Sequence, residues 1–186
     1  MSKIKVVHYI NQFFANIGGE EKADIKPELH VGEVIGPGMA FKAQFKDEAE
    51  IVATIVCGDS YFGENTKEAT ATIMEMIKEQ KPDLFIAGPA FNAGRYGFAC
   101  GNICKAVHDE LGIPVLTGMY KENPGTDYAK DVLMVSTKNS AAGMRDAVGK
   151  MAPLALKLAK GEEIGASAVE GYIPNGIRKN FFEEER

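Results

Sequence analysis

The sequence predicts an α/β fold: a three-layer sandwich on a mainly parallel five-stranded sheet, of the Rossmann or flavodoxin-like kind. Two observations support it, because apolar runs of strand length recur along the chain and amphipathic segments with helical spacing separate them. The clearest unit covers residues 83–118, where an apolar run stops at Gly88-Pro89, a helical pattern follows, and a β-branched run begins at Ile113. Two strands joined through a helix lie parallel in one sheet.

The composition of each segment justifies its assignment. The first strand is rich in β-branched residues, and the second is almost continuously apolar, as expected for a sheet covered on both faces. The first helix carries apolar and charged residues on opposite faces, and in the last helix Pro153 favours a kink. The strands are expected at 4–10, 51–57, 84–87, 113–116 and 132–135. The helices are expected at 66–80, about 98–111 and 140–160.

The chain is expected to contain one α/β domain, residues 1–160, followed by a C-terminal extension, residues 161–186. Within the domain, a long excursion at about 18–50 holds scattered apolar residues and the turn signals Lys26-Pro27 and Gly36-Pro37-Gly38. A connection of that length is usually functional or a contact surface. The extension is rich in glycine, proline and charge, and we expect it to pack on a partner or to lead toward another segment.

Composition limits the classes of function. The 186 residues are 45% hydrophobic and 25% charged, which is typical of a soluble globular domain. A net charge of -5 without a basic stripe argues against nucleic-acid binding. The sequence contains neither a signal core nor a membrane-length apolar run, so we expect a cytoplasmic protein without membrane contact. Three cysteines do not make a disulfide framework, and we expect them to be reduced thiols.

The candidate site follows from topology. Carboxyl ends of parallel strands meet at one edge of the sheet, and open α/β sheets bind their ligands there. Polar or aromatic loops follow every expected strand. We therefore expect the functional site at this edge. The segments that should meet are Asn11 and Gln12, Asp59 to Asn65, Asn92 to Tyr96, Tyr120 to Asn123, and Ser136 to Ser140.

The loop 88–97 is the strongest candidate for binding a carboxylate. Arg95 can hold a carboxylate bidentately, Asn92 can orient it, and backbone amides at the start of a helix add further donors. Tyr96 adds an aromatic ring. In the structural alternative, the glycines serve the turn and Arg95 pairs with an acid of the protein. The glycine spacing fits neither a dinucleotide fingerprint nor a phosphate-binding loop, so nucleotide binding is not supported.

The segment 58–65 is the candidate for binding a cation. Asp59 and Glu64 lie beside the aromatic residues Tyr61 and Phe62, and rings next to acids attract a small cationic group. The alternative is about as strong: these polar residues cap helices, and the rings pack inward. Tyr120, after the next strand along the sheet, completes the set of expected substrate-binding residues.

No catalytic residue and no metal site can be assigned. Cys100 and Cys104 lie four residues apart and would share one helix face, which leaves a redox pair or half a metal site open. Core packing is favoured for both, and for Cys57, because free cysteines are commonly buried. The spacing does not suit zinc, and the three histidines do not cluster.

At these same loops the sequence resembles the selenoprotein subunit of component B of the glycine, sarcosine and betaine reductases of amino-acid-fermenting anaerobes. The resemblance covers essentially the whole chain and rests on long uninterrupted strings. These are VVHYINQFF (6–14), GPGMAF (36–41), CGDSYFGEN (57–65), GPAFNAGRYG (88–97), TGMY (117–120) and VSTKNSAAGM (135–144).

The resemblance implies reductive C–N cleavage of glycine or an N-methylglycine to acetyl phosphate and the amine. In the family, a pyruvoyl group on a partner subunit activates the amine, and selenocysteine passes the carboxymethyl group to selenoprotein A. Family members are longer, and their selenocysteine motif lies in a later part that this sequence lacks. The chain is therefore expected to be the amino-terminal domain of a component B subunit, inactive in isolation, without a cofactor of its own, and part of an oligomer.

Two other functions stay open at this point. One is a non-catalytic module that binds a small zwitterion, which the missing nucleophile favours. The other is a flavodoxin-like oxidoreductase, which the fold class favours. The sequence does not distinguish glycine, sarcosine and betaine as substrates.

Overall fold

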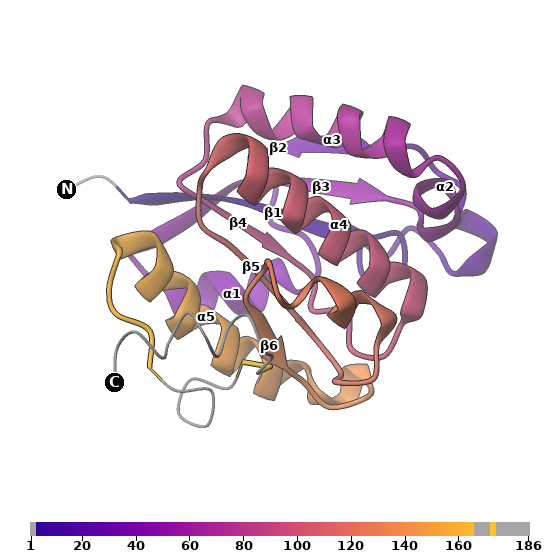
Figure 1. Cartoon of the computed structure of the whole chain (residues 1–186). Helices are drawn as coiled ribbons and strands as arrows, with labels where there is room; N and C mark the ends of the chain where they lie inside the picture. The colour runs from indigo at the N-terminus through magenta and orange to yellow at the C-terminus, as the bar shows by residue number, and fades with distance from the viewer. Residues whose placement is uncertain (1–2, 166–171, 174–186) are drawn as a thin grey trace.

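The fold is built on one six-stranded sheet with the strand order β2-β3-β1-β4-β5-β6 (Figure 1). The structure is a computed structural model that describes residues 3–165 and 172–173. All neighbouring strands pair in parallel except β2, which pairs antiparallel to β3 at one edge. The strands are β1 Ile4–Asn11, β2 Glu28–Val31, β3 Ala49–Cys57, β4 Leu84–Ala87, β5 Val115–Met119 and β6 Met134–Ser136.

Helices cover both faces of the sheet, which makes the expected three-layer sandwich (Figure 1). Successive β1 side chains point to opposite faces, so Val7 joins Ile103 of α4 in one apolar cluster and Val6 joins Met151 of α5 in the other. α2 and α3 lie on the α4 side, and α1 lies with α5. The α-helices are α1 Gly38–Phe45, α2 Asp59–Glu64, α3 Thr66–Gln80, α4 Gly94–Leu111 and α5 Met144–Lys160. The 3-10 helices are η1 Glu20–Lys22, η2 Pro124–Tyr128 and η3 Ala141–Gly143.

The sequence prediction is confirmed for the five parallel strands and needs one correction, because the sheet has a sixth strand. The excursion at 18–50 contains more regular secondary structure than expected, namely η1, β2 and α1. β2 is short and only partly buried, so its sequence lacks the apolar run of a central strand. The expected C-terminal extension, 161–186, falls mostly outside the described residues. Within them, Ile173 N donates to Met134 O at 2.6 Å.

α4 begins earlier than its apolar pattern indicates. The first apolar residue at helical spacing is Phe98, which predicts a start near residue 98, whereas the helix starts at Gly94. Arg95 and Tyr96 therefore lie in the first turn of a helix and not in a loop. This difference decides the direction of both side chains at the site.

The strand order creates a crevice at the carboxyl edge of the sheet. From β1 the chain moves to β3 on one side and then returns to β4 on the other. The five parallel strands lie in the order β3-β1-β4-β5-β6 across the sheet. When these five are numbered from 1 to 5 in chain order, the arrangement is 2-1-3-4-5, which is the flavodoxin-like order. In such sheets a crevice opens where the winding reverses, here beyond the ends of β1 and β4, and ligands bind in it.

Candidate functional site

A pocket of about 340 Å³ lies at this crevice. Known small-molecule sites are roughly 300–1,000 Å³, so the volume suits a small ligand. The loops after β1, β3, β4 and β6 all contribute to its wall, and η1 closes one side. The two segments that the site prediction depends on, 59–65 and 92–96, meet here, since Arg95 donates to Ser60 Oγ at 2.5 Å.

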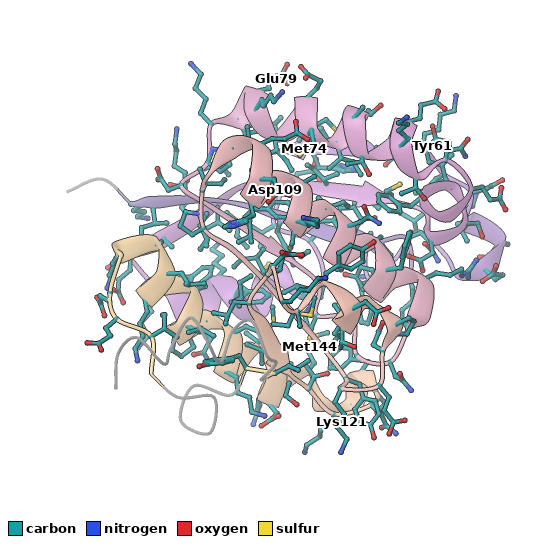
Figure 2. The ribbon with its side chains drawn as sticks, in the orientation of Figure 1. Tyr61, Met74, Glu79, Asp109, Lys121 and Met144 are labelled. Atoms are coloured by element: carbon teal, nitrogen blue, oxygen red, sulfur yellow. The ribbon has the colours of Figure 1, made fainter. Side chains whose placement is uncertain are left out.

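The seven sequence-predicted substrate residues divide into two groups. Three of them line the pocket: Asp59, Asn92 and Arg95. The remaining four do not contribute to the wall, namely Tyr61, Glu64, Tyr96 and Tyr120. Tyr96 is fully buried and points into the core, because the early start of α4 turns it inward. Tyr61 lies on α2 beside the start of α3, away from the crevice (Figure 2).

The aromatic residues at the pocket are phenylalanines that the sequence reading did not assign. Phe13, Phe14 and Phe91 line it, and their rings form a continuous group. The Phe13 and Phe14 centroids lie 5.2 Å apart, and those of Phe14 and Phe91 lie 6.2 Å apart. Phe13 is 58% exposed. The available signal was the Phe13-Phe14 pair directly after the first strand, at an exit already expected to reach the site.

Asp59 is the buried acid of the pocket. The residue is 6% exposed, and Asn11 Nδ2 donates to its Oδ2 at 2.9 Å. Its backbone N–H donates to Gln12 Oε1 at 3.1 Å, so two residues from the end of β1 hold it in place. Oδ1 is buried without a hydrogen-bond partner among the described residues. Burial raises the pKa of this carboxyl, while the bond from Asn11 and the charge of Arg95 lower it.

Arg95 is the basic group of the pocket, and it is already engaged. One terminal nitrogen donates to Ser60 Oγ and the other to Glu20 Oε1, each at 2.5 Å. The bond to Glu20 is the main reason why the pKa of Arg95 is raised. The structural alternative for Arg95, pairing with an acid of the protein, is thus present. Glu20 carried no sequence signal, because it lies in the irregular excursion.

The loop that leads into α4 is fixed by Asn123. This fully buried side chain donates to Phe91 O at 2.9 Å and to Ala93 O at 3.0 Å, and it accepts from Gly125 N at 2.9 Å. Phe91 itself has a positive φ of 51°, which is strained for a residue with a bulky side chain. No described side chain caps α4. The first N–H groups of a helix have no intrahelical partner, and Ala93 and Arg95 at this helix start line the pocket.

The three thiols are all buried and are not placed as nucleophiles. Burial raises the pKa of Cys57 to about 12 and also raises the pKa values of Cys100 and Cys104. Since the thiolate is the reactive form, such cysteines are inert. Among the residues that the structure describes, no three side chains of His, Cys, Asp or Glu are grouped to bind a metal ion.

Thiol labelling tests this placement. In the folded chain at pH 8, we expect iodoacetamide to react at least about 100-fold more slowly than in the urea-unfolded chain, since burial limits both access and thiolate formation. Mass spectrometry over time measures the modified fraction at Cys57, Cys100 and Cys104. Rapid modification of Cys57 in the folded chain would contradict the burial described here.

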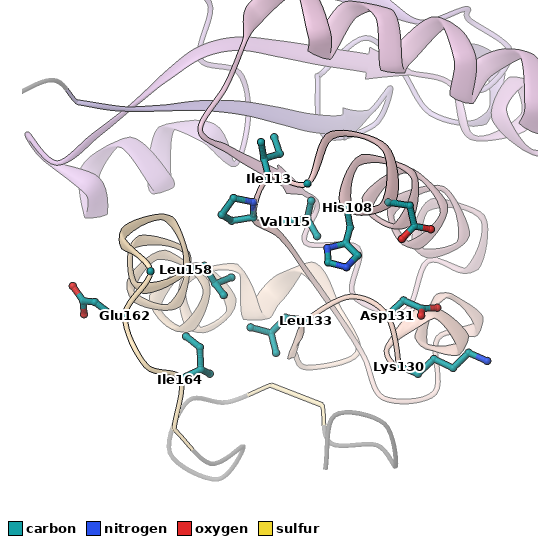
Figure 3. A pocket seen from close by; sticks show the side chains of 13 residues that line it. His108, Ile113, Val115, Lys130, Asp131, Leu133, Leu158, Glu162 and Ile164 are labelled. Carbon is teal, nitrogen blue, oxygen red and sulfur yellow. The ribbon is translucent and has the colours of Figure 1, made fainter. Parts of the chain in front are cut away.

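A second pocket lies at the opposite, amino-terminal edge of the sheet (Figure 3). Its volume is about 600 Å³, and it lies between the carboxyl ends of α4 and α5. Ile113, Leu133 and Ile164 give it an apolar wall, with His108 and Asp131 at its side. None of the sequence-predicted site residues lines it.

Among the described helices, none has the length and apolarity needed to span a membrane.

Comparison with known proteins gives a consistent result. The family model described as glycine/sarcosine/betaine reductase selenoprotein B (GRDB) matches residues 3–186. The chain is 61% identical over 187 residues to the sarcosine reductase complex component B subunit beta of Peptoclostridium acidaminophilum. It is 60% identical over 187 residues to the glycine reductase complex component B subunit gamma of Carboxydothermus hydrogenoformans. A betaine reductase complex component B subunit beta, also of P. acidaminophilum, is 42% identical over 182 residues.

The matches cover this chain and only part of each relative. The first two relatives align with 100% of this chain but with 43% of their own length, and the third with 97% and 41%. No solved structure matches the chain. The names of these relatives describe subunits of multi-component reductase complexes. From the match of nearly all its residues to one family model, the chain belongs to the glycine/sarcosine/betaine reductase selenoprotein B family.

Proposed function

We propose that this chain is the amino-terminal domain of a component B subunit and that it binds the substrate of the reductase in the 340 Å³ pocket. The complex would reductively cleave the C–N bond of glycine or an N-methylglycine to give acetyl phosphate and the amine. One observation carries the proposal: Asp59, a buried carboxyl with one oxygen that has no partner among the described residues, and the guanidinium of Arg95 line one small pocket. An acidic and a basic side chain in one small pocket suit a small zwitterion, which carries one charge of each sign.

The cationic end of the ligand is assigned to Asp59 and the phenylalanine group. Oδ1 of Asp59 offers an acceptor that no described protein donor uses. A buried carboxylate attracts an ammonium strongly, because the surrounding dielectric is low. The Phe13, Phe14 and Phe91 rings add cation-π attraction, which also applies to a quaternary ammonium without N–H donors. Glycine, sarcosine and betaine share this cationic feature.

The carboxylate end is assigned to Arg95, assisted by the first turn of α4. A guanidinium has five N–H donors and binds a carboxylate bidentately. The uncapped N–H groups of α4 and the helix dipole favour negative charge at the same place. Asn92 also lines this part of the pocket and can orient the ligand.

The reductive step itself is assigned to groups outside this chain. The selenocysteine and the partner's pyruvoyl group are implied by the family alone, and the buried thiols of this chain do not fit the role of the selenol. The chain would work with a pyruvoyl-containing component B subunit and selenoprotein A, in an oligomer in the cytoplasm. The 340 Å³ pocket is larger than the ligand needs, which leaves space for a partner's group beside it.

Calorimetric titration of the Arg95→Ala variant tests the proposal. Glycine, sarcosine and betaine are each titrated into the wild-type chain, and into its complex with the partner subunits. We expect the variant to bind about ten- to a hundredfold more weakly, because it loses charge-assisted hydrogen bonds. Arg145→Ala, an exposed arginine of α5, is the matched control and should leave affinity unchanged. Equal affinity of Arg95→Ala and wild type would end the assignment.

The flavodoxin-like strand order favours one competing function, a flavin-dependent oxidoreductase. An absorbance spectrum of the purified chain separates the two functions. A bound flavin gives visible absorption, whereas the proposed zwitterion site gives none. Flavin absorption that follows the protein through purification would favour the oxidoreductase.

A further inference from the structure

The guanidinium assigned to the ligand is held by a carboxylate of the protein itself. Glu20 Oε1 accepts from Arg95 at 2.5 Å, and both residues line the pocket. Glu20 thus occupies the position on Arg95 that the carboxylate of a ligand would take. The chemical groups are the same, a carboxylate facing a guanidinium.

The Glu20–Arg95 pair is exposed and therefore exchangeable. Glu20 exposes 74% of its side chain and Arg95 exposes 49%. Exposed ion pairs contribute little net free energy, because water solvates the separated groups almost as well. Ser60 Oγ holds the other terminal nitrogen of Arg95, so the guanidinium keeps one contact when Glu20 leaves.

Glu20 is also free to move without disturbing the core. It lies in η1, a helix of three residues without buried side chains. The following segment is fixed separately, since Ala23 O accepts from the backbone N–H groups of Ser60 and Tyr61 at 2.8 and 3.0 Å. A rotation of the Glu20 side chain into solvent therefore breaks only surface contacts.

We propose that Glu20 is a specificity-determining residue: an internal carboxylate that holds Arg95 in the empty pocket and that the carboxylate of the ligand replaces. This inference rests on the proposed function, because it assumes that Arg95 receives the ligand. Its consequence is that Glu20 lowers the affinity for ligands with a carboxylate relative to simple amines. A ligand with a carboxylate competes with Glu20 for Arg95, whereas a simple amine reaches Asp59 without displacing it.

Titration of three probes into three proteins tests the inference. The probes are glycine, acetate and methylamine, and the proteins are wild type, Glu20→Gln and Glu21→Gln. We expect Glu20→Gln to bind glycine and acetate about two- to fivefold more tightly than wild type does, with methylamine affinity unchanged within twofold. Glu21→Gln removes the same charge from the neighbouring residue without touching Arg95, so its affinities should match those of wild type.

The outcomes separate the inference from the proposed function. If wild type binds glycine and Glu20→Gln binds it equally or more weakly, Glu20 is a permanent positioning partner of Arg95 and the inference is overturned. Equal gains in Glu20→Gln and Glu21→Gln would also overturn it, because they would report general electrostatics. If wild type binds none of the three probes, alone or in the complex, both the proposed function and the inference fall.

Discussion

Replacing Asp59 with asparagine is expected to abolish recognition of the cationic end of the ligand. The same substitution is expected to make the chain without bound ligand more stable at neutral pH. Removing one partner of a buried charge pair typically costs 2–5 kcal/mol, so glycine and betaine should bind at least about 30-fold more weakly. Asparagine keeps an oxygen that can accept from Asn11, so the local fold is retained. Calorimetric titration at neutral pH measures the loss.

The stability gain follows from the raised pKa of Asp59. A carboxyl whose folded-state pKa is raised favours folding in its neutral form, so its contribution is fully present below the unfolded pKa of about 4 and is lost as pH rises through the folded-state value. In urea unfolding, the free energy of unfolding should therefore depend on pH equally for wild type and Asp59→Asn at acid pH. As pH rises, Asp59→Asn should become increasingly more stable than wild type. Asp47→Asn, an exposed aspartate, is the control. A pH-independent difference would contradict the account.

Replacing Asn123 with alanine is expected to be among the most destabilising single changes in the chain. The substitution breaks three hydrogen bonds and leaves the Phe91 and Ala93 carbonyls and the Gly125 N–H without this partner. Each buried polar group left unpaired costs about 1–3 kcal/mol, so we expect a loss of about 3 kcal/mol or more in the free energy of unfolding. Urea denaturation monitored by circular dichroism measures it.

A matched control for Asn123 is Asn102→Ala. Asn102 makes one partly buried bond, to Tyr128 Oη at 2.9 Å, and its loss should cost about 1 kcal/mol. The side chain of Asn123 also packs directly against Gly97, since a Cβ at Gly97 would overlap it. A loss of 1 kcal/mol or less in Asn123→Ala would mean that the loop into α4 does not depend on this residue.

The parallel part of the fold could be predicted because each central strand is a compact apolar run with a turn signal at its end. β2 could not, since an edge strand of four partly exposed residues has no such run. α1 could not either, because two glycines and a proline at its start resemble a loop. Tertiary packing, rather than local pattern, orders this excursion.

The position of the pocket could be predicted from the sequence, and its lining only in part. The meeting of Asp59 and Arg95 followed from topology, because strand exits in a parallel sheet share one edge. The direction of each side chain could not be predicted in the same way. Tyr96 directly follows Arg95, yet in the first turn of α4 its side chain points into the core. Glu20 lies 75 residues from Arg95 in the sequence, and only the three-dimensional structure brings the two together.

A crystal structure of the chain with glycine or betaine tests the central claim most directly. The account predicts the ligand in the pocket beyond β1 and β4, with its nitrogen at Asp59 Oδ1, its carboxylate on Arg95, and Glu20 displaced. A ligand bound elsewhere, or bound with its carboxylate away from Arg95, would contradict the account.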